Sequence, residues 1–144
     1  MPVTVKNISL WRKEVENKPG ALAKTIEPLA KTGADLHVVM GYRYPGDETK
    51  AAIELYPVMG KKSLAAAQQA GLTSSSIPTL LVEGDNKPGL GHSIAQAIAE
   101  AGIDLSFLIV QVIGRKYSAV IGFVNETDSE KAKALIKKVV SRKK

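Results

Sequence analysis

One short sequence occurs twice in the chain, at residues 17–20 and again at residues 86–89, and it reads Asn-Lys-Pro-Gly in both places. The two copies lie 69 positions apart, and at this offset eight of the twenty-one positions from residue 16 to residue 36 are identical without a gap. The further identities are Ala30/Ala99, Gly33/Gly102, Asp35/Asp104 and Leu36/Leu105. Self-similarity at one offset indicates a duplicated structural unit. The sequence therefore predicts two copies of one module, residues 1–72 and 73–144.

Modules of about 70 residues are near the lower limit for an independent hydrophobic core, so we expect each to depend on the other or on a partner. Hydrophobic residues make up 44% of the chain and charged residues 24%, as in ordinary globular proteins. The chain has no cysteine, no apolar run of 18 residues, and no charged-then-apolar leader. We therefore expect a cytoplasmic protein without disulfides or a membrane span.

The net charge of +6 is concentrated near the C-terminal end of the chain. The residues responsible are Lys131, Lys133, Lys137, Lys138, Arg142, Lys143 and Lys144. This pattern favours a solvated helix face followed by a frayed end. The alternative is a basic patch that contacts an acidic protein or a nucleic acid.

Hydrophobic periodicity gives the order of elements in the first module. Leu22, Ile26 and Leu29 recur on one helical face, and Pro28 predicts a bend or a loosened turn within that helix. Pro19 suits the first turn of the helix, and Gly33 suits its end. The expected elements are a long strand at 3–16, a helix at about 20–32, strands at 36–40 and 51–56, a helix at 60–70, and a short strand at 73–77.

The second module repeats this order. Its expected elements are a strand at 79–84, a helix at about 89–101, strands at about 104–114 and 117–125, and a helix at about 127–141 that is capped near Asn125. The predicted fold class is α+β, with two ferredoxin-like βαββαβ units whose antiparallel sheets pack side by side and carry helices on one face. The second module has no evident fourth strand. Either Val3 to Val5 or a strand of another subunit is expected to fill that edge.

Each Asn-Lys-Pro-Gly sequence joins the end of a strand to the start of a helix. Free backbone N–H groups at a helix start form a small site for an anion such as a carboxylate. The amides of Asn17 and Asn86 both donate and accept hydrogen bonds, which suits the polar head of an amino acid. The alternative without a ligand is that asparagine caps the helix, proline starts it and glycine shapes the turn.

The residues around the two turns match as well. Glu16 to Leu22 are followed by Gly33-Ala34-Asp35-Leu36, and Asp85 to Leu90 are followed by Gly102-Ile103-Asp104-Leu105. Over nearly its whole length the chain therefore resembles a tandem pair of ACT domains, and it is similar to the serine-sensing ACT domain of phosphoglycerate dehydrogenase. ACT domains are regulatory modules that commonly bind amino acids between paired domains. The resemblance implies ligand contacts from Asn17, Lys18, Pro19, Gly20, Ala21, Leu22 and Asp35, and from Asn86, Lys87, Pro88, Gly89, Leu90 and Asp104.

The chain departs from that serine-sensing domain at positions near the ligand. Val15 and Gly84 stand where that domain has a histidine, and Asp35 and Asp104 stand where it has an asparagine. An aspartate favours a ligand's ammonium group and disfavours its carboxylate, which implies a changed selectivity. The alternative is that both aspartates only shape helix-to-strand turns. The modules also differ from each other: Ala21-Leu22 corresponds to Leu90-Gly91, which predicts unequal pockets.

The other functional residue types form no recognisable constellation. His37 and His92 have no second ligand at metal spacing, Trp11 suits a core or subunit contact, and the strands lack the paired aromatics of RNA-binding domains. The sequence contains no nucleophile elbow, P-loop or Rossmann glycine signature. We therefore expect a homodimeric, non-enzymatic amino-acid sensor without cofactor or metal that signals to a regulated enzyme or regulator protein. The alternative is a structural or interaction module with a basic tail and no small ligand.

Overall fold

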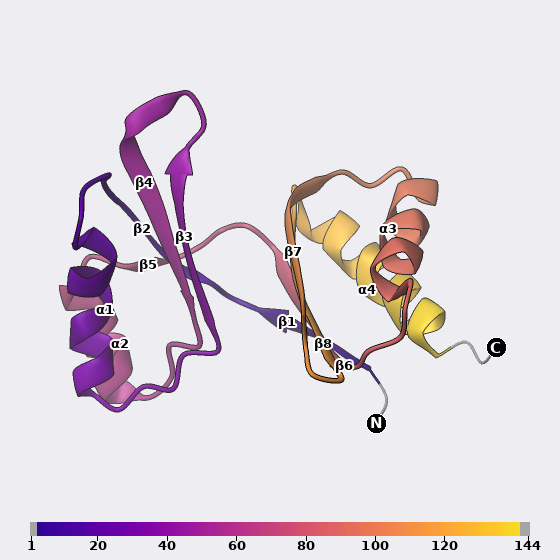
Figure 1. The fold of residues 1–144 in the computed structure, drawn as a ribbon, viewed down its shortest axis with the longest axis horizontal. Helices are drawn as coiled ribbons and strands as arrows, with labels where there is room; N and C mark the ends of the chain where they lie inside the picture. The colour runs from indigo at the N-terminus through magenta and orange to yellow at the C-terminus, as the bar shows by residue number, and fades with distance from the viewer. Residues whose placement is uncertain (1–2, 142–144) are drawn as a thin grey trace. The chain divides into compact units, whose positions relative to one another are not determined.

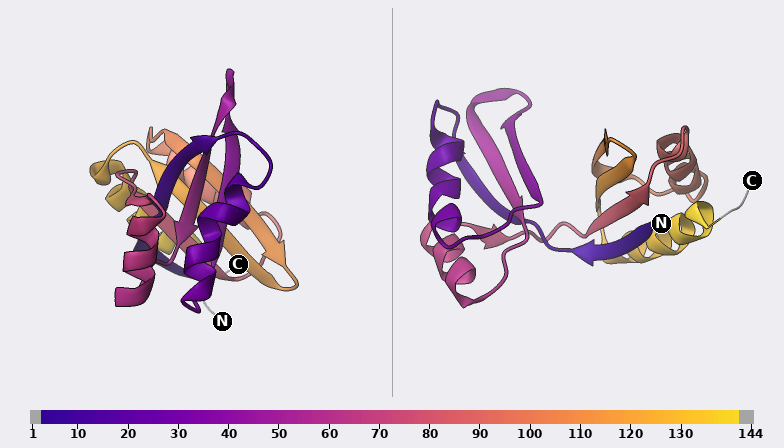
Figure 2. Two further views of the ribbon diagram at one scale, coloured as in Figure 1. Left: turned by 90° about the vertical axis from the view of Figure 1, so that its left-hand side faces the viewer. Right: turned by 60° about the horizontal axis from the view of Figure 1, so that its bottom comes forward.

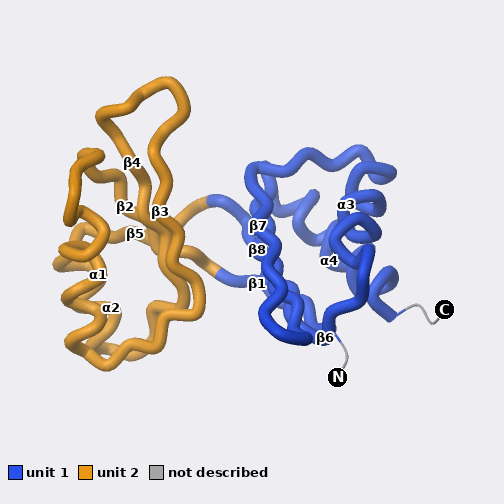
Figure 3. The backbone as a smooth tube through the Cα atoms, viewed as in Figure 1, with its two compact units in different colours: residues 1–8, 77–144 blue, residues 9–76 orange. Residues whose placement is uncertain are grey.

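The computed structural model describes residues 3–141, which divide into two compact units (Figure 3). Unit 2 is residues 9–76, and unit 1 combines residues 1–8 with residues 77–144. The expected modules, 1–72 and 73–144, follow the duplication in the sequence, whereas the compact units follow contacts in space. The two divisions differ because residues 3–8 belong with the second half of the chain and residues 73–76 with the first.

Unit 2 has two helices on one face of a four-stranded antiparallel sheet (Figure 1). Its sheet order is β3-β4-β2-β5, so β3 and β5 are the edge strands. The elements are β2 (Trp11–Glu16), α1 (Ala21–Lys31), β3 (Val38–Tyr44), β4 (Asp47–Tyr56), α2 (Lys61–Gln69) and β5 (Thr73–Ser74). Leu29, Ile53, Leu55, Ala67 and Leu72 are buried between the helices and the sheet.

Unit 1 has the same construction, with α3 and α4 on one face of its sheet (Figures 1 and 2). The elements are β1 (Thr4–Ile8), β6 (Thr79–Asp85), α3 (Leu90–Glu100), β7 (Leu105–Ile113), β8 (Lys116–Phe123) and α4 (Glu126–Val140). The sheet order is β1-β6-β8-β7, which leaves β7 as an edge strand. Two antiparallel four-stranded sheets with paired helices confirm the predicted fold class of repeated βαββαβ-like units.

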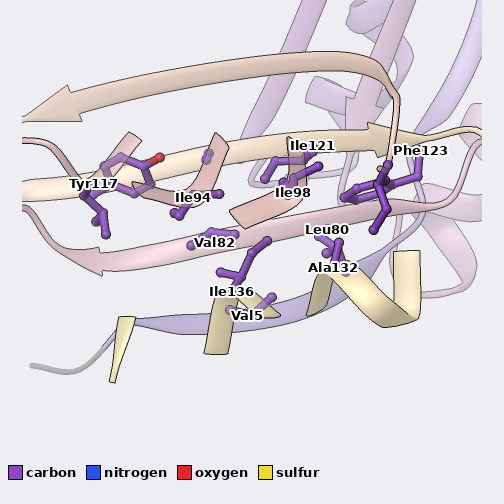
Figure 4. Close-up of a cluster of buried hydrophobic side chains, with 13 residues drawn as sticks. Val5, Leu80, Val82, Ile94, Ile98, Tyr117, Ile121, Phe123, Ala132 and Ile136 are labelled. Atoms are coloured by element: carbon purple, nitrogen blue, oxygen red, sulfur yellow. The ribbon is translucent and has the colours of Figure 1, made fainter. Parts of the chain in front are cut away.

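Strand β1 completes the sheet of unit 1 by pairing antiparallel with β6, from Thr4 opposite Glu83 to Ile8 opposite Thr79. This confirms the N-terminal version of the expectation for the missing edge strand. Val5 points into the core of unit 1 beside Leu80 and Val82 (Figure 4). Burying a side chain of this size contributes roughly 1.5–3 kcal/mol.

The prediction of one continuous strand over residues 3–16 is wrong. The chain leaves the first strand after Ile8, and Ser9 and Leu10 separate it from β2. β1 pairs with β6 while β2 pairs with β4 and β5. The backbone hydrogen bonds of β1 and β2 therefore go to different sheets, so the chain cannot continue as one strand from β1 into β2.

The remaining elements lie close to their expected positions. β4 starts four residues before the predicted position, and the strand expected at 73–77 is only Thr73–Ser74. The Asn125 side chain caps α4 by accepting a hydrogen bond from the Asp128 amide at 2.8 Å, as predicted. The bend expected at Pro28 stays a prediction, and part of the predicted basic tail, residues 142–144, lies outside the described residues. No helix within residues 3–141 is long and apolar enough to cross a membrane.

Candidate functional site

The first Asn-Lys-Pro-Gly turn is anchored to the end of the sheet of unit 2. The backbone N–H of Asn17 donates to the carbonyl of Thr49 at 2.9 Å, and its side-chain amide donates to the carbonyl of Glu48 at 2.8 Å. No side chain caps α1. The asparagine therefore extends the β2–β4 pairing, and the alternative in which it caps the helix does not hold for Asn17.

The glycines of the two turns adopt the same left-handed backbone conformation, with φ of 87° at Gly20 and 86° at Gly89. Side chains rarely tolerate this region, which explains why glycine occupies both positions. Each glycine directly precedes its helix. Pro19 therefore lies before the helix, and the expectation that it occupies the first helical turn is wrong.

The start of α1 offers backbone donors to a ligand. The Ala21 amide donates to the Lys18 carbonyl at 3.3 Å, closing the turn. Within residues 3–141 the next two amides, of Leu22 and Ala23, have no hydrogen-bond acceptor. Uncapped N–H groups at a helix start attract anions because the helix dipole adds to their partial positive charge.

A hollow of about 220 Å³ lies beside this turn. Four predicted site residues line it: Asn17, Lys18, Ala21 and Leu22. The predicted residues Pro19 and Gly20 shape the turn but do not line the hollow. The other walls come from the strands: Val15 and Glu16 on β2, Gly41, Tyr42 and Arg43 on β3, and Ala51, Ala52 and Ile53 on β4. Sequence reasoning placed Val15 near the ligand but missed the residues of β3 and β4.

The charges at the hollow are two cations and one carboxylate. Lys18 Nζ lies 3.4 Å from Glu16 Oε2, and both side chains are exposed. Arg43 forms no ion pair with any other described residue. One guanidinium at the hollow therefore lacks a counter-charge from residues 3–141.

The second turn, in unit 1, repeats the backbone geometry. The Asn86 amide N–H donates to the Arg115 carbonyl at 2.8 Å, and the Leu90 N–H donates to the Lys87 carbonyl at 3.0 Å. Unlike Asn17, Asn86 makes no side-chain hydrogen bond to any described residue. Its side chain remains available to another molecule.

On the strands, unit 1 has larger side chains at positions that line the hollow of unit 2, whereas at the helix start Gly91 stands in place of Leu22. The paired strands place Tyr117 where unit 2 has Ala51, and Val110 where it has Gly41. The hydroxyl of Tyr117 reaches the start of α3, lying 3.8 Å from where a Cβ of Gly91 would stand. Tyr117 is 2% exposed, and burial raises the pKa of its hydroxyl.

A larger open groove of about 970 Å³ lies on the helical side of unit 1, between α3 and α4. Of the predicted site residues it includes Lys87, Pro88 and Leu90, but not Asn86, Gly89 or Asp104. Leu90 is 8% exposed and belongs to the core. Side chains of α3 and α4 line most of this groove, and the predicted polar residues Asn86 and Asp104 are absent from it. The hollow of unit 2 is therefore the better candidate site.

The predicted aspartates lie away from the turn of their own unit. Asn17 is at the end where α1 begins, whereas Asp35 follows the end of this 11-residue helix, about 16 Å further along. The carboxylate of Asp35 is 3.2 Å from His37 Nε2 and is exposed. Asp104 has the corresponding position after α3. Neither aspartate therefore shares a pocket with the turn of its own unit.

A polar network covers the sheet face of unit 2 opposite the helices. Arg12 donates to the hydroxyl of Tyr44, which donates to Glu14 Oε2 at 3.0 Å. The Tyr42 hydroxyl donates to Glu54 Oε2 at 2.9 Å. Burial, followed by the Glu54 carboxylate, raises the pKa of Tyr42. No cluster of three or more metal-ligating side chains occurs within residues 3–141.

Neither a protein-family model nor a curated protein matches the chain, but solved structures share its fold. A protein from Bacteroides thetaiotaomicron matches with a TM-score of 0.74 and 16% identity, covering 93% of this chain and 89% of its own. The regulatory subunit of aspartate kinase from Thermus thermophilus matches with a TM-score of 0.61 and 16% identity, covering 96% and 97%. Aspartate kinase from Clostridium acetobutylicum matches at 0.58 and 11% identity, covering 96% of this chain and 34% of the enzyme. These similarities support the ACT-like fold.

Proposed function

We propose that the protein is a non-enzymatic regulatory protein that binds a small amino acid at the hollow of unit 2. The observation that carries this proposal is the hollow itself, which brings Asn17 and Lys18 together with the uncapped start of α1. Small-molecule sites combine a concave surface with a few convergent polar groups. The fold shared with regulatory subunits of aspartate kinase is consistent with this role.

The polar head of an amino acid fits the charges at the turn. Its carboxylate accepts hydrogen bonds from the helix-start amides of Leu22 and Ala23, and Lys18 adds a positive charge nearby. Its ammonium group pairs with the carboxylate of Glu16. No cofactor or metal is needed for this recognition.

A second copy of the chain supplies the other side of the site. β3 is an edge strand whose end lies near the Asn17 turn and whose start follows Asp35. Antiparallel pairing along β3 brings the start of one β3 beside the end of the other. The Asp35 of one copy thus approaches the Asn17 turn of the next.

Ligand binding transmits a signal through this pairing. An amino acid held between two copies stabilises the paired arrangement, because it contacts both copies only when they are together. A regulated enzyme or regulator protein in the cytoplasm distinguishes the paired from the unpaired arrangement, which couples its activity to the amino-acid level.

A thermal-shift screen against the twenty amino acids tests the proposal. Ligand at 100 times its dissociation constant adds roughly 2.7 kcal/mol to the stability of the folded state. We expect a clear rise in melting temperature with one amino acid or a small group, and loss of that rise in the variant Lys18→Ala. The matched control Lys87→Ala, at the filled turn, keeps the rise. If no amino acid shifts the melting temperature, the sensor proposal fails and the interaction module with a basic surface becomes the better explanation.

A further inference from the structure

We infer that the hollow of unit 2 selects amino acids with an acidic side chain, and that each chain binds one such ligand. This inference rests on the proposed function and adds the ligand class and the stoichiometry. It comes from two observations: a guanidinium without a counter-charge at the hollow, and a tyrosine that fills the corresponding space in unit 1.

Arg43 is the residue that recognises the acidic side chain. It lies on β3 opposite Ala51, a pairing that places both residues on the same sheet face, and both line the hollow. The lysine at the turn is already paired with Glu16, whereas Arg43 has no carboxylate partner within residues 3–141. A guanidinium binds a carboxylate through two parallel hydrogen bonds, which gives geometric as well as electrostatic selectivity.

Each polar group of such a ligand has a partner among the residues that line the hollow. The helix start and Lys18 receive the α-carboxylate, Glu16 receives the ammonium group, and Arg43 receives the second carboxylate. Ala21 and Ala51 are small, and Leu22, which lies over Gly41, forms an apolar wall between these groups. A volume of about 220 Å³ suits a ligand of this size rather than a peptide.

Unit 1 has neither the arginine nor the open space that this binding requires. The strand pairing puts Val112 at the position of Arg43, and the side chain of Tyr117 occupies the position of Ala51. Leu90, in place of Ala21, is part of the core. The second turn therefore keeps its backbone shape while its own side chains occupy the ligand space, so binding at this turn is excluded.

Isothermal titration calorimetry with matched amino acids tests the inference. Glutamate and glutamine, like aspartate and asparagine, have nearly the same shape, so a difference within a pair reports the charge. We expect the acidic member of one pair to bind at least about 10-fold more tightly than its amide, with one site per chain. Arg43→Gln is expected to abolish this preference, while the matched control Arg115→Gln in unit 1 retains it.

The variant Ala51→Tyr reproduces the filled space of unit 1 and is expected to abolish binding, with circular dichroism to verify folding. If that variant unfolds, the inference is tested by two results: the comparison of acidic amino acids with their amides, and the effect of Arg43→Gln. Equal or tighter binding of the amides, an unchanged preference in Arg43→Gln, or two sites per chain would overturn this inference and leave the proposed function standing. Absence of binding by every amino acid would overturn both.

Discussion

At the scale of single residues, Glu54 on β4 is an acidic side chain buried in unit 2. Its side chain is 1% exposed. One carboxylate oxygen accepts the hydrogen bond of the Tyr42 hydroxyl, and the other has no hydrogen-bond partner within the described residues. A buried carboxylate is strongly destabilising unless it is hydrogen-bonded. Tyr42 therefore stabilises the folded state by donating this hydrogen bond to Glu54.

The variant Tyr42→Phe removes that contact and leaves a buried carboxylate without a hydrogen bond. We expect a loss of roughly 1–3 kcal/mol in the free energy of unfolding, measured by urea denaturation. Tyr44→Phe is the matched control: it removes the hydrogen bonds of Tyr44 with Arg12 and with the exposed side chain of Glu14, but it leaves no buried carboxylate without a hydrogen bond, so we expect a smaller effect. An equal loss in both variants would contradict this explanation.

Asp85, at the end of β6, shows how a neighbouring lysine lowers the pKa of a carboxyl group. Lys116 Nζ donates to Asp85 Oδ1 at 2.6 Å, and this hydrogen bond is the main cause that lowers the pKa of Asp85 from 3.8 to about 2. A carboxyl group whose pKa is lower in the folded state adds stability at pH values above its unfolded pKa. That contribution is lost as the pH falls from about 4 to about 2.

The variant Lys116→Met is expected to raise the pKa of Asp85 toward 3.8, as measured by NMR titration of its side-chain carboxyl carbon. The loss of stability between pH 4 and pH 2 should become shallower. The control Lys50→Met removes the lysine 3.3 Å from Glu14, whose lowered pKa depends first on Tyr44. A Glu14 pKa that moves as far as that of Asp85 would show that lysine contacts dominate at both sites.

At the scale of elements, the sequence predicted every helix and most strands, because their periodicity is a local property. The break after Ile8 was missed because both strands alternate in the same way, and alternation does not report which sheet a strand joins. Of the candidate site, the sequence predicted the residues of the turn but not those of β3 and β4. The turn residues form a contiguous motif, whereas Gly41, Arg43 and Ala51 meet only when β3 pairs with β4.

Deleting residues 1–5 removes Thr4 and Val5, the first two of the five residues of β1, and exposes the part of the β6 backbone edge opposite them. We expect a clear drop in melting temperature, because Val5 leaves the core of unit 1. Hydrogen exchange is expected to show lost protection in β6 and unchanged protection in β4, whose partners belong to unit 2. The control variant Lys6→Ala keeps the strand and should behave as wild type. An unchanged melting temperature in the deletion would mean that β1 pairing contributes little to stability.

At the scale of the whole molecule, β7 is a surface suited to a second copy of the chain. Its nine residues include no charge, and it has no strand on its outer side within the described chain. Leu108, Ile109, Val110, Val112 and Ile113 are exposed on it. Long apolar edge strands readily pair with another chain.

The variant Val112→Lys is therefore expected to weaken the homodimer at least about 10-fold, measured by analytical ultracentrifugation over a concentration series. Val112 is 49% exposed, so the folded chain tolerates the lysine. The matched control is Val124→Lys, since Val124 is 65% exposed but lies outside every strand. A wild-type protein that sediments as a monomer at all concentrations would refute the homodimer.

The pairing of β1 with β6 also determines the order in which the protein can fold during synthesis. β1 leaves the ribosome before unit 2, and its partner β6 follows only after all of unit 2 has been made. At synthesis rates of about 5–20 residues per second, β1 waits for roughly 4–15 seconds. Unit 2 is continuous in sequence and needs no later segment, so it can fold during this interval. The sheet of unit 1 is then completed with a strand that was made before any other strand of that sheet, so β1 stays unpaired while unit 2 folds.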